Sequence, residues 1–219
     1  MKSGVGDWRV YLVTDEALCC GRSLEEIVRR ALAGGADVVQ LREKDIATRE
    51  FVSRARCLKE ILAGSGVPLI INDRIDVALA VGAEGVHVGQ SDMEIADVRR
   101  LVGPEMIVGL SLDTPEQLAA GEAADVDYYG VSPVFVTPTK DVKHSAWGLE
   151  GLRCLRQRTK RHLVAIGGIN HDNAAQVFAA GADSLAVVSA ICAAADPTAA
   201  TAALRACAGD NQAGLAEQK

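Results

Sequence analysis

The stretch VVQLREKD at residues 38–45 begins apolar and ends charged, and it is the part of the sequence that decides the fold. Its two β-branched residues indicate a buried strand, whose charged end would reach solvent or a ligand. Gln40, Arg42 and Lys44 alternate, so an extended chain places them on one face. Three donors on one face, two of them cationic, suit an anion such as phosphate. Taken alone, the stretch fits a solvated, charged loop better, and the rest of the chain decides between the two interpretations.

Short β-rich runs alternate with helical patterns on both sides of this stretch. We predict strands at residues 9–14, 38–42, 68–72, 85–88, 107–111, 128–132, 163–166 and 184–189. The helices between and after them are expected at residues 23–34, 48–63, 75–82, 93–102, 115–123, 149–160, 171–180 and 197–207. This alternation predicts an α/β protein, a TIM (β/α)8 barrel forming a single domain over residues 1–219, with a C-terminal tail that frays from about residue 208. The competing architecture, an open doubly wound sheet, would prefer a Gly-rich loop after the first strand, where this chain has Thr14-Asp15-Glu16.

Glycines mark the expected ends of several helices. They are Gly34, Gly64, Gly82, Gly103, Gly121 and Gly181. A short phrase also recurs where a helix gives way to a strand: Gly35-Ala36-Asp37, Gly82-Ala83-Glu84, Gly181-Ala182-Asp183 and a degenerate Ala123-Ala124-Asp125. Its uneven spacing indicates a rhythm of βα units and not a strict repeat.

Composition excludes some classes of partner. The net charge of −6 argues against bulk affinity for nucleic acid or an anionic membrane, so any anion must be bound by a local cluster. The six cysteines show no CxxC pair and no zinc spacing, and the polar N-terminus lacks the apolar core of a signal peptide. We therefore expect reduced thiols in a cytoplasmic protein that acts on small molecules.

The histidines show no metal-ligand spacing, and His87 is expected to be buried and hydrogen-bonded within its strand. The sequence leaves the oligomeric state open, a homo-oligomer included.

In a barrel of this kind the carboxyl ends of the strands meet at one face, where active sites are built. Polar and charged residues follow the predicted strands at that face, whereas Gly, Ala, Val and Pro dominate the opposite ends. This asymmetry favours anion binding by the opening stretch. Asp73 and Asp92 follow neighbouring strands, and two such carboxylates can share a Mg²⁺ ion. Each aspartate alone is better explained as a helix cap. Together with Arg42, Lys44, Asn72 and Lys140 at the same face, the two aspartates favour a metal.

Two further loops offer phosphate-binding groups. The connection at residues 132–147 is long, and long loops in compact domains are often functional. Its hydroxyl and ammonium donors are Thr137, Thr139 and Lys140. Gly167-Gly168 and Ser189 follow the last two strands, where barrels commonly bind phosphate, although a tight turn explains the glycine pair equally well.

Seven motifs, in order along the chain, resemble the thiamine-phosphate synthase family. They are VQLREKD (39–45), NDR (72–74), GVHVGQSD (85–92), PVFVTPTK (133–140), GLE (148–150), AIGGI (165–169) and AVVSAI (186–191). The resemblance implies a TIM barrel that joins hydroxymethylpyrimidine diphosphate to a thiazole phosphate, with release of pyrophosphate and formation of thiamine phosphate.

The resemblance also implies roles by position. It assigns the pyrimidine diphosphate to Gln40, Leu41, Arg42, Glu43, Lys44, Asn72, Ser111 and Lys140, with Ser111 at the pyrimidine. It assigns Mg²⁺ to Asp73 and Asp92. It assigns the thiazole phosphate to Thr137, Pro138, Thr139, Gly168, Val188 and Ser189. The catalytic groups would be Arg42, Lys44 and Lys140, which with Mg²⁺ neutralise the departing diphosphate. The family's proposed course is dissociative and needs no nucleophilic side chain, which agrees with the absence of a recognisable nucleophile motif here.

Two positions depart from the family pattern. Members often have His where Asp113 stands and Gly where Ser132 stands, and both changes would affect the pocket without removing a matched ligand residue. The first alternative function is the related thiazole tautomerase, which would not need the paired aspartates or the full cationic set. The second is a non-catalytic sensor of thiamine phosphate, for which the sequence carries no effector or DNA-binding module.

Overall fold

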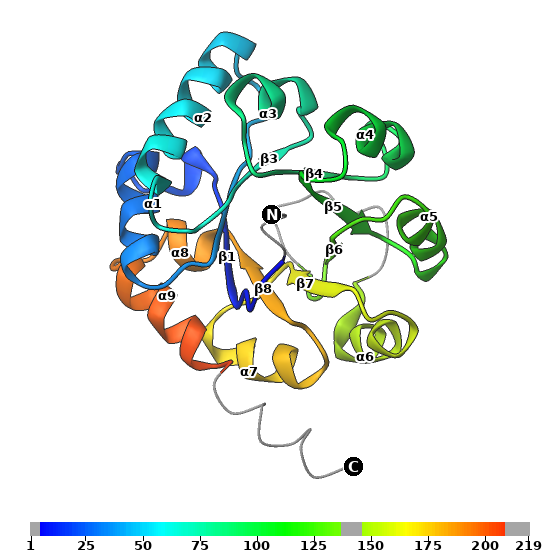
Figure 1. Cartoon of the computed structure of the whole chain (residues 1–219). Coiled ribbons are helices and arrows are strands. Elements are labelled where there is room, and N and C mark those ends of the chain that lie inside the picture. Colours follow the sequence, from blue (N-terminus) through cyan, green and yellow to red (C-terminus); the bar gives the residue numbers. More distant parts are fainter. Residues whose placement is uncertain (1–4, 137–145, 209–219) are drawn as a thin grey trace.

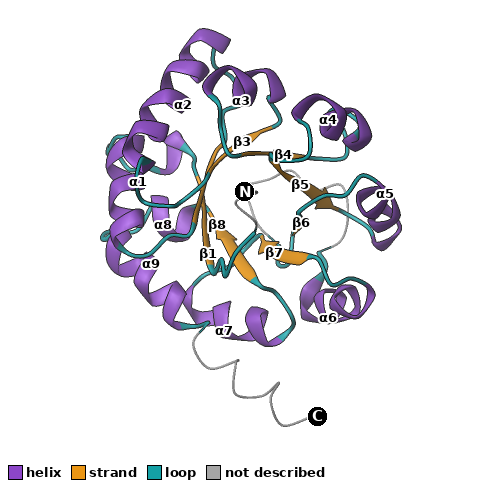
Figure 2. Cartoon of the chain, in the orientation of Figure 1, coloured by secondary structure: helices purple, strands orange, loops and turns teal. Residues whose placement is uncertain are grey.

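The chain forms a closed barrel of eight parallel strands, each paired with the next and β8 paired with β1. The computed structural model describes residues 5–136 and 146–208. Figure 1 looks along the barrel and shows the helices as an outer ring, and Figure 2 separates the two layers by colour. The predicted TIM barrel is confirmed.

The element bounds agree closely with those expected from periodicity. The strands are β1 (Val10–Val13), β2 (Val38–Leu41), β3 (Leu69–Asn72), β4 (Gly85–Val88), β5 (Ile107–Leu112), β6 (Tyr128–Val131), β7 (His162–Ile166) and β8 (Ser184–Val187). The α-helices are α1 (Leu24–Ala33), α2 (Thr48–Leu62), α3 (Ile75–Val81), α4 (Ile95–Val102), α5 (Leu118–Ala123), α6 (Gly148–Arg158), α7 (His171–Ala179), α8 (Ser189–Cys192) and α9 (Pro197–Ala206). Two 3₁₀ turns, η1 (Glu16–Leu18) and η2 (Pro115–Gln117), precede α1 and α5. Within the described residues, the helices are too short or too polar to cross a membrane.

Three predictions about helix and strand bounds are wrong. The last strand ends at Val187, and Ser189 begins the short helix α8, so Ser189 is not a strand residue. Residues 115–123 form a 3₁₀ turn followed by α5, where one continuous helix was expected. Gly121 lies inside α5 and does not end it. Its role is steric, because a Cβ there would lie 2.4 Å from the ring of Tyr129.

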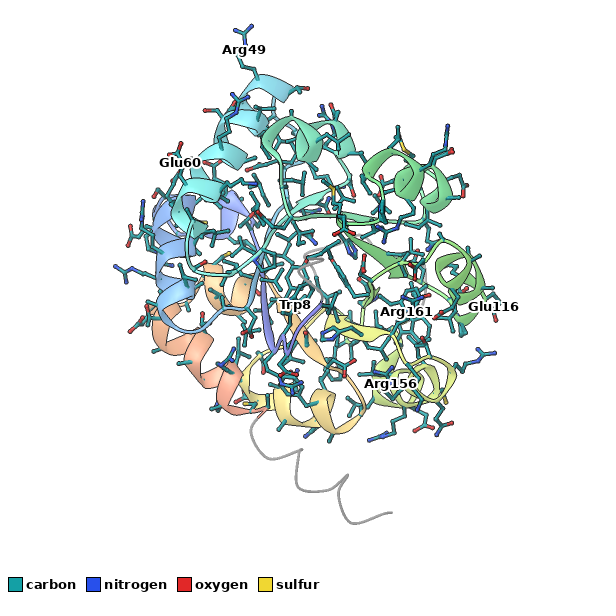
Figure 3. All side chains as sticks on the ribbon, viewed as in Figure 1. Trp8, Arg49, Glu60, Glu116, Arg156 and Arg161 are labelled. Atoms are coloured by element: carbon teal, nitrogen blue, oxygen red, sulfur yellow. The ribbon has the colours of Figure 1, made fainter. Side chains whose placement is uncertain are left out.

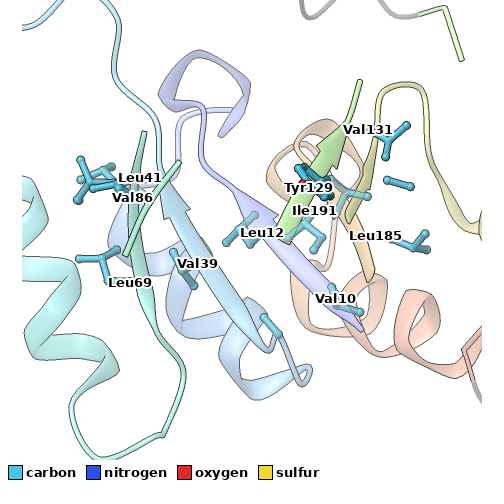
Figure 4. Packing of buried hydrophobic residues seen from close by; sticks show 14 of the residues in the cluster. Val10, Leu12, Val39, Leu41, Leu69, Val86, Tyr129, Val131, Leu185 and Ile191 are labelled. Atoms are coloured by element: carbon cyan, nitrogen blue, oxygen red, sulfur yellow. The ribbon is translucent and has the colours of Figure 1, made fainter. Parts of the chain in front are cut away.

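Alternate residues of each strand face the helices or the barrel interior. The outward residues build the main hydrophobic core, and Figure 4 shows part of it, with Leu12, Val39 and Leu185 on three different strands. A smaller inner cluster includes Tyr11, Tyr128 and the strand residues that face the axis. Trp8 packs edge-on against both tyrosine rings, with ring centroids 6.2 and 5.7 Å away, and Figure 3 shows it near the middle of the ring of strands. Trp8 precedes β1, so it lies at the amino-terminal ends of the strands and leaves the opposite end for a site.

The recurring Gly-Ala-Asp phrase has a structural role at the amino-terminal ends of the strands. Asp37, just before β2, accepts hydrogen bonds from the main-chain N–H groups of Arg9 (2.8 Å) and Val10 (3.0 Å), at the start of β1. The equivalent bonds run from Leu69 to Glu84, from Val108 to Asp127 and from Leu163 to Asp183. The four carboxylates also pair with basic side chains, which are Arg205, Lys59, Arg99 and Arg156 respectively. Each carboxylate thus joins an even-numbered strand to the odd-numbered strand before it.

The fourth copy of the phrase lies two residues beyond its predicted place. It is Asp125-Val126-Asp127, not Ala123-Ala124-Asp125, because Asp127 makes the carboxylate contact. Asp125 occupies the glycine position with φ of +53°, while Gly35 in the first copy has φ of +90°. Aspartate visits this left-handed region more readily than most residues, so the backbone turn is kept although the glycine is lost.

We expect Asp127→Ala to lower the free energy of unfolding by about 3 kcal/mol, because it leaves a largely buried guanidinium without its carboxylate. The side chains of Asp127 and Arg99 are 9% and 15% exposed and 2.8 Å apart. Asp97→Ala is the matched control, since its pair with Arg100 is 51% and 75% exposed, and we expect it to cost less than about 1 kcal/mol. Guanidinium unfolding followed by circular dichroism measures both. Equal losses in the two variants would contradict the structural role of the phrase.

Candidate active site

Opposite charges gather at the carboxyl ends of β2, β3 and β4. Lys44 Nζ, in the loop after β2, lies 2.5 Å from Asp73 Oδ2, directly after β3. Asp92, in the loop after β4, lies close enough to Asp73 for the two carboxylates to interact. Burial, followed by the neighbouring Asp73 carboxylate, raises the pKa of Asp92, whereas the Lys44 ammonium lowers it. The two carboxylates therefore lie beside one ammonium group, and oxygen donors placed together in this way suit a divalent cation.

The backbone holds both aspartates in fixed positions. Asp73 has φ of +62°, a left-handed conformation that non-glycine residues seldom adopt and that is often found at functional sites. Its N–H donates to the carbonyl of His87 on β4 (2.8 Å), which ties the end of β3 to the neighbouring strand. Asp92 Oδ2 accepts from the N–H of Gly89 (2.7 Å), so this carboxylate closes its own loop. Neither aspartate is the N-cap residue of the helix that follows, which removes the capping explanation.

Arg42 lies beside this group at the end of β2. Its N–H donates to Thr14 Oγ1 (3.1 Å), and its guanidinium is 4.0 Å from Asp15 Oδ2 in the loop after β1. The alternate residues turn the other way: Leu41 is fully buried in the outer core, and Glu43 Oε1 accepts from Arg54 Nη1 on α2 (2.8 Å). Any contact of Leu41 or Glu43 with a ligand would therefore involve the main chain.

Gln40, Asn72 and Ser111 line the inner end of the site and are between 5% and 8% exposed. Gln40 Nε2 donates to the hydroxyl of Tyr11 (2.8 Å), and Ser111 Oγ lies 2.9 Å from His87 Nε2. Sequence reasoning placed His87 in its strand with hydrogen-bond partners, which is correct, but the residue is half-buried. It missed Tyr11 and Tyr128, because nothing in a strand pattern shows that a hydroxyl will meet a partner across the barrel.

The ends of β7 and β8 supply a second group of backbone positions. Gly168 follows β7 with φ of +64°, and a Cβ there would lie 2.8 Å from the Cβ of Phe135. Val188 and Ser189 follow β8, where Val188 is the N-cap of α8. The predicted residues Thr137, Pro138, Thr139 and Lys140 lie outside the described residues.

Asp113, where members of the resembling family often have histidine, lines a hollow whose lining does not include Ser111. It lines an apolar hollow of about 350 Å³ with Trp147 and Leu155, between η2 and α6. Its N–H donates to Gln117 Oε1 (2.7 Å). This half-buried residue therefore helps to shape the start of α5.

Comparison with known proteins gives a consistent family. The family model described as thiamine monophosphate synthase matches residues 10–191. The thiamine-phosphate synthase of Albidiferax ferrireducens is 55% identical over 197 residues, which covers 90% of each chain. That of Leptospira biflexa is 52% identical over 200 residues, covering 90% of this chain and 95% of the relative.

Solved structures agree with the sequence relatives. The thiamine phosphate pyrophosphorylase from Pyrococcus furiosus superposes with a TM-score of 0.85 at 38% identity, over 93% of this chain and 96% of that one. A 3-hexulose-6-phosphate synthase from Salmonella typhimurium also matches, with a TM-score of 0.70 at 17% identity over 91% of this chain and 98% of that one, and shares the fold alone.

Proposed function

The chain belongs to the thiamine monophosphate synthase family, and we propose that it releases pyrophosphate through the charged group at the ends of β2, β3 and β4. It is a transferase that makes thiamine phosphate, as its relatives are named for doing. In this reaction the bond between the pyrimidine methylene carbon and the diphosphate oxygen breaks, and a bond from that carbon to the thiazole nitrogen forms. Pyrophosphate leaves with both electrons of the broken bond, so neutralising its charge lowers the barrier.

The contact between Lys44 and Asp73, with Asp92 beside it, is the observation that carries the proposal. Two carboxylates would repel a diphosphate if they acted alone. Next to a lysine they can instead hold a divalent cation, and the two positive groups together offset the negative charge of the diphosphate. The tautomerase alternative has no use for this arrangement, because it transfers no diphosphate.

The oxygen donors present fit Mg²⁺. Within residues 5–136 and 146–208, no group of three His, Cys, Asp or Glu side chains is arranged around a metal position. A magnesium ion needs fewer protein ligands, since it keeps several waters and binds substrate phosphate oxygens. The interaction of Asp73 with Asp92 leaves excess negative charge that a cation would offset. Asp73 and Asp92 would hold the ion, and when bound it supplies charge neutralisation to the leaving oxygens.

Basic side chains supply the remaining neutralisation. The main chain of Arg42 is anchored to Thr14, and its guanidinium, 4.0 Å from the Asp15 carboxylate, would bind the diphosphate. Arg42 offers the paired donors that suit phosphate oxygens, and Lys44 offers a compact charge. Lys140, from the connection outside the described residues, is proposed as the third cation on the basis of its motif.

The thiazole phosphate would bind where the last two strands end. Gly168 follows β7, and Val188 and Ser189 lie at the start of α8, directly after β8. Barrels of this class often bind phosphate with N–H groups at these strand ends. Thr137, Pro138 and Thr139 are proposed on this side by their motif. Gln40 and Ser111 would hold the pyrimidine between the two anions. Because no nucleophilic side chain takes part, most of the remaining rate acceleration would come from holding the two rings in line.

The function is tested by mixing the pyrimidine diphosphate, the thiazole phosphate and the protein and measuring pyrophosphate. We expect release in Mg²⁺ that requires both substrates and stops when EDTA is in excess. Reactions that lack one substrate are the controls for simple hydrolysis. Absence of release above background in Mg²⁺ would refute the proposal, and unchanged release in EDTA would refute the metal.

A further inference from the structure

A continuous line of hydrogen bonds crosses the barrel interior beneath the site. We call it the central hydrogen-bond network, and its members are Gln40, Tyr11, Tyr128, His87 and Ser111. Gln40 Nε2 lies 2.8 Å from Tyr11 Oη, which lies 2.8 Å from Tyr128 Oη. Tyr128 Oη lies 3.0 Å from His87 Nδ1, and His87 Nε2 lies 2.9 Å from Ser111 Oγ. Both ends of the network are residues proposed to hold the pyrimidine.

The surrounding chain keeps space for this network and fixes its ends. A Cβ on Gly109 would lie 2.1 Å from the Tyr128 ring, and one on Gly130 would lie 2.9 Å from the His87 ring. The carbonyl of Ser111 accepts from Gln90 Nε2 (2.6 Å), so the main chain of Ser111 is held as well as its hydroxyl. Tyr11 and Tyr128 are at most 1% exposed, and their burial raises the pKa of each phenol. Each phenol therefore stays protonated and has a proton to donate.

The order of donors follows from the Gln40 end. An amide nitrogen only donates, so Tyr11 Oη accepts from Gln40. Within the described residues the other contact of this hydroxyl is Tyr128, so the buried Tyr11 proton goes there. When Tyr11 donates to Tyr128, the Tyr128 proton is left for His87 Nδ1, 3.0 Å away. A neutral His87 that accepts at Nδ1 carries its proton on Nε2, 2.9 Å from Ser111 Oγ, and donates it there.

In this order Ser111 Oγ accepts from His87, so the hydroxyl proton of Ser111 points away from the network and can be donated to a ligand. Gln40 uses its Nε2 for Tyr11, so its Oε1 can accept from a ligand. We infer that the central hydrogen-bond network fixes Ser111 as a donor and Gln40 as an acceptor for the pyrimidine ring, so that Tyr11, Tyr128 and His87 are positioning residues that set specificity for an aminopyrimidine. An aminopyrimidine offers ring nitrogens that accept and an exocyclic amino group that donates, which complements the pair. A pyrimidinone, whose ring N–H donates and whose exocyclic oxygen accepts, does not. The inference rests on the proposed function, because it deepens the pyrimidine end of that site.

Tyr128→Phe tests the inference, because it removes one hydroxyl from the middle of the network and keeps the ring. His87 then loses the donor to Nδ1, and the Ser111 proton is no longer directed outward. We expect the Kd for the pyrimidine diphosphate, measured by calorimetry without the thiazole substrate, to rise about five- to tenfold, the size of one lost hydrogen bond. The KM for the thiazole phosphate and the Kd for inorganic pyrophosphate should not change.

Tyr129→Phe is the matched control. It makes the same change one residue along β6, where the hydroxyl points outward to Leu118 O and Glu122 Oε1. We expect its Kd for the pyrimidine diphosphate to equal that of the wild type. Equal weakening in both variants would refute the inference, as would an unchanged Kd in Tyr128→Phe.

Ligand analogues test the direction of the bonds. Each of two analogues carries C–H in place of one ring nitrogen, and a third lacks the amino group. For one of the C–H analogues the effect of Tyr128→Phe should disappear, because the acceptor for Ser111 is already missing. If the effect disappears only for the analogue without the amino group, Ser111 is an acceptor and the inferred order is wrong. Wild-type pyrophosphate release, measured separately, shows whether a negative result concerns the network or the proposed function.

Discussion

Asp92→Ala is expected to lower kcat for pyrophosphate release by about 10²- to 10³-fold, because the charge stabilisation that a divalent ion gives a leaving group amounts to several kcal/mol. The variant removes one of the two carboxylates that converge after β3 and β4. It also removes the acceptor for the N–H of Gly89, a loop contact of modest energy. The barrel should therefore remain folded while turnover is lost.

The metal role predicts more than a loss of rate. Asp92→Asn keeps the shape of the side chain and removes its charge, so it should raise the Mg²⁺ concentration that gives half-maximal rate. Asp97→Asn is the control, because it neutralises an exposed carboxylate on α4 that pairs with Arg100. Steady-state rates over a Mg²⁺ titration measure all three variants. If Asp92→Ala turns over at the wild-type rate, Asp92 does not bind a catalytic metal.

Lys44→Gln is the second substitution with a large expected effect. Lys44 is the charged group that contacts Asp73, and its side chain is 50% exposed, so it can reach a ligand above the strand ends. Loss of one donor aimed at developing negative charge typically costs about 10²- to 10³-fold in kcat. We expect a decrease in kcat of this size, with a smaller change in the KM for the thiazole phosphate, which would bind after β7 and β8.

Lys59→Gln provides the comparison for Lys44. Lys59 also pairs with a carboxylate, Glu84, at 3.2 Å, but this pair lies at the amino-terminal ends of the strands. The two variants lose the same charge from opposite ends of the barrel, so changes in net charge cannot explain a difference between them. We expect Lys59→Gln to keep the wild-type rate. Equal rates in Lys44→Gln and the wild type would show that the diphosphate is neutralised by other groups.

Local periodicity was sufficient to predict most of the fold. The strand at Gly85–Val88 has the predicted bounds, and the other strands differ from prediction by one or two residues at an end. Where prediction failed, a contact distant in sequence decided the outcome. Gly121 reads as a helix end, yet Tyr129 packs against it and the helix continues. Asp127 was not distinguished from Asp125, because its role depends on an N–H group on another strand.

The sequence by itself determined that this chain is a barrel of alternating strands and helices, and that cations and carboxylates follow the strands at one end. Both conclusions depend on order along the chain, because strand direction fixes which residues reach which face. Only the tertiary structure decided that Lys44 contacts Asp73, that Glu43 turns away to Arg54, and that Tyr11 meets Tyr128. The alternation of residues along a strand shows which side chains point into the barrel. The stagger between neighbouring strands decides which of these side chains lie at the same height along the barrel axis. That stagger is set by the pairing of all eight strands together, and no single stretch of sequence contains it.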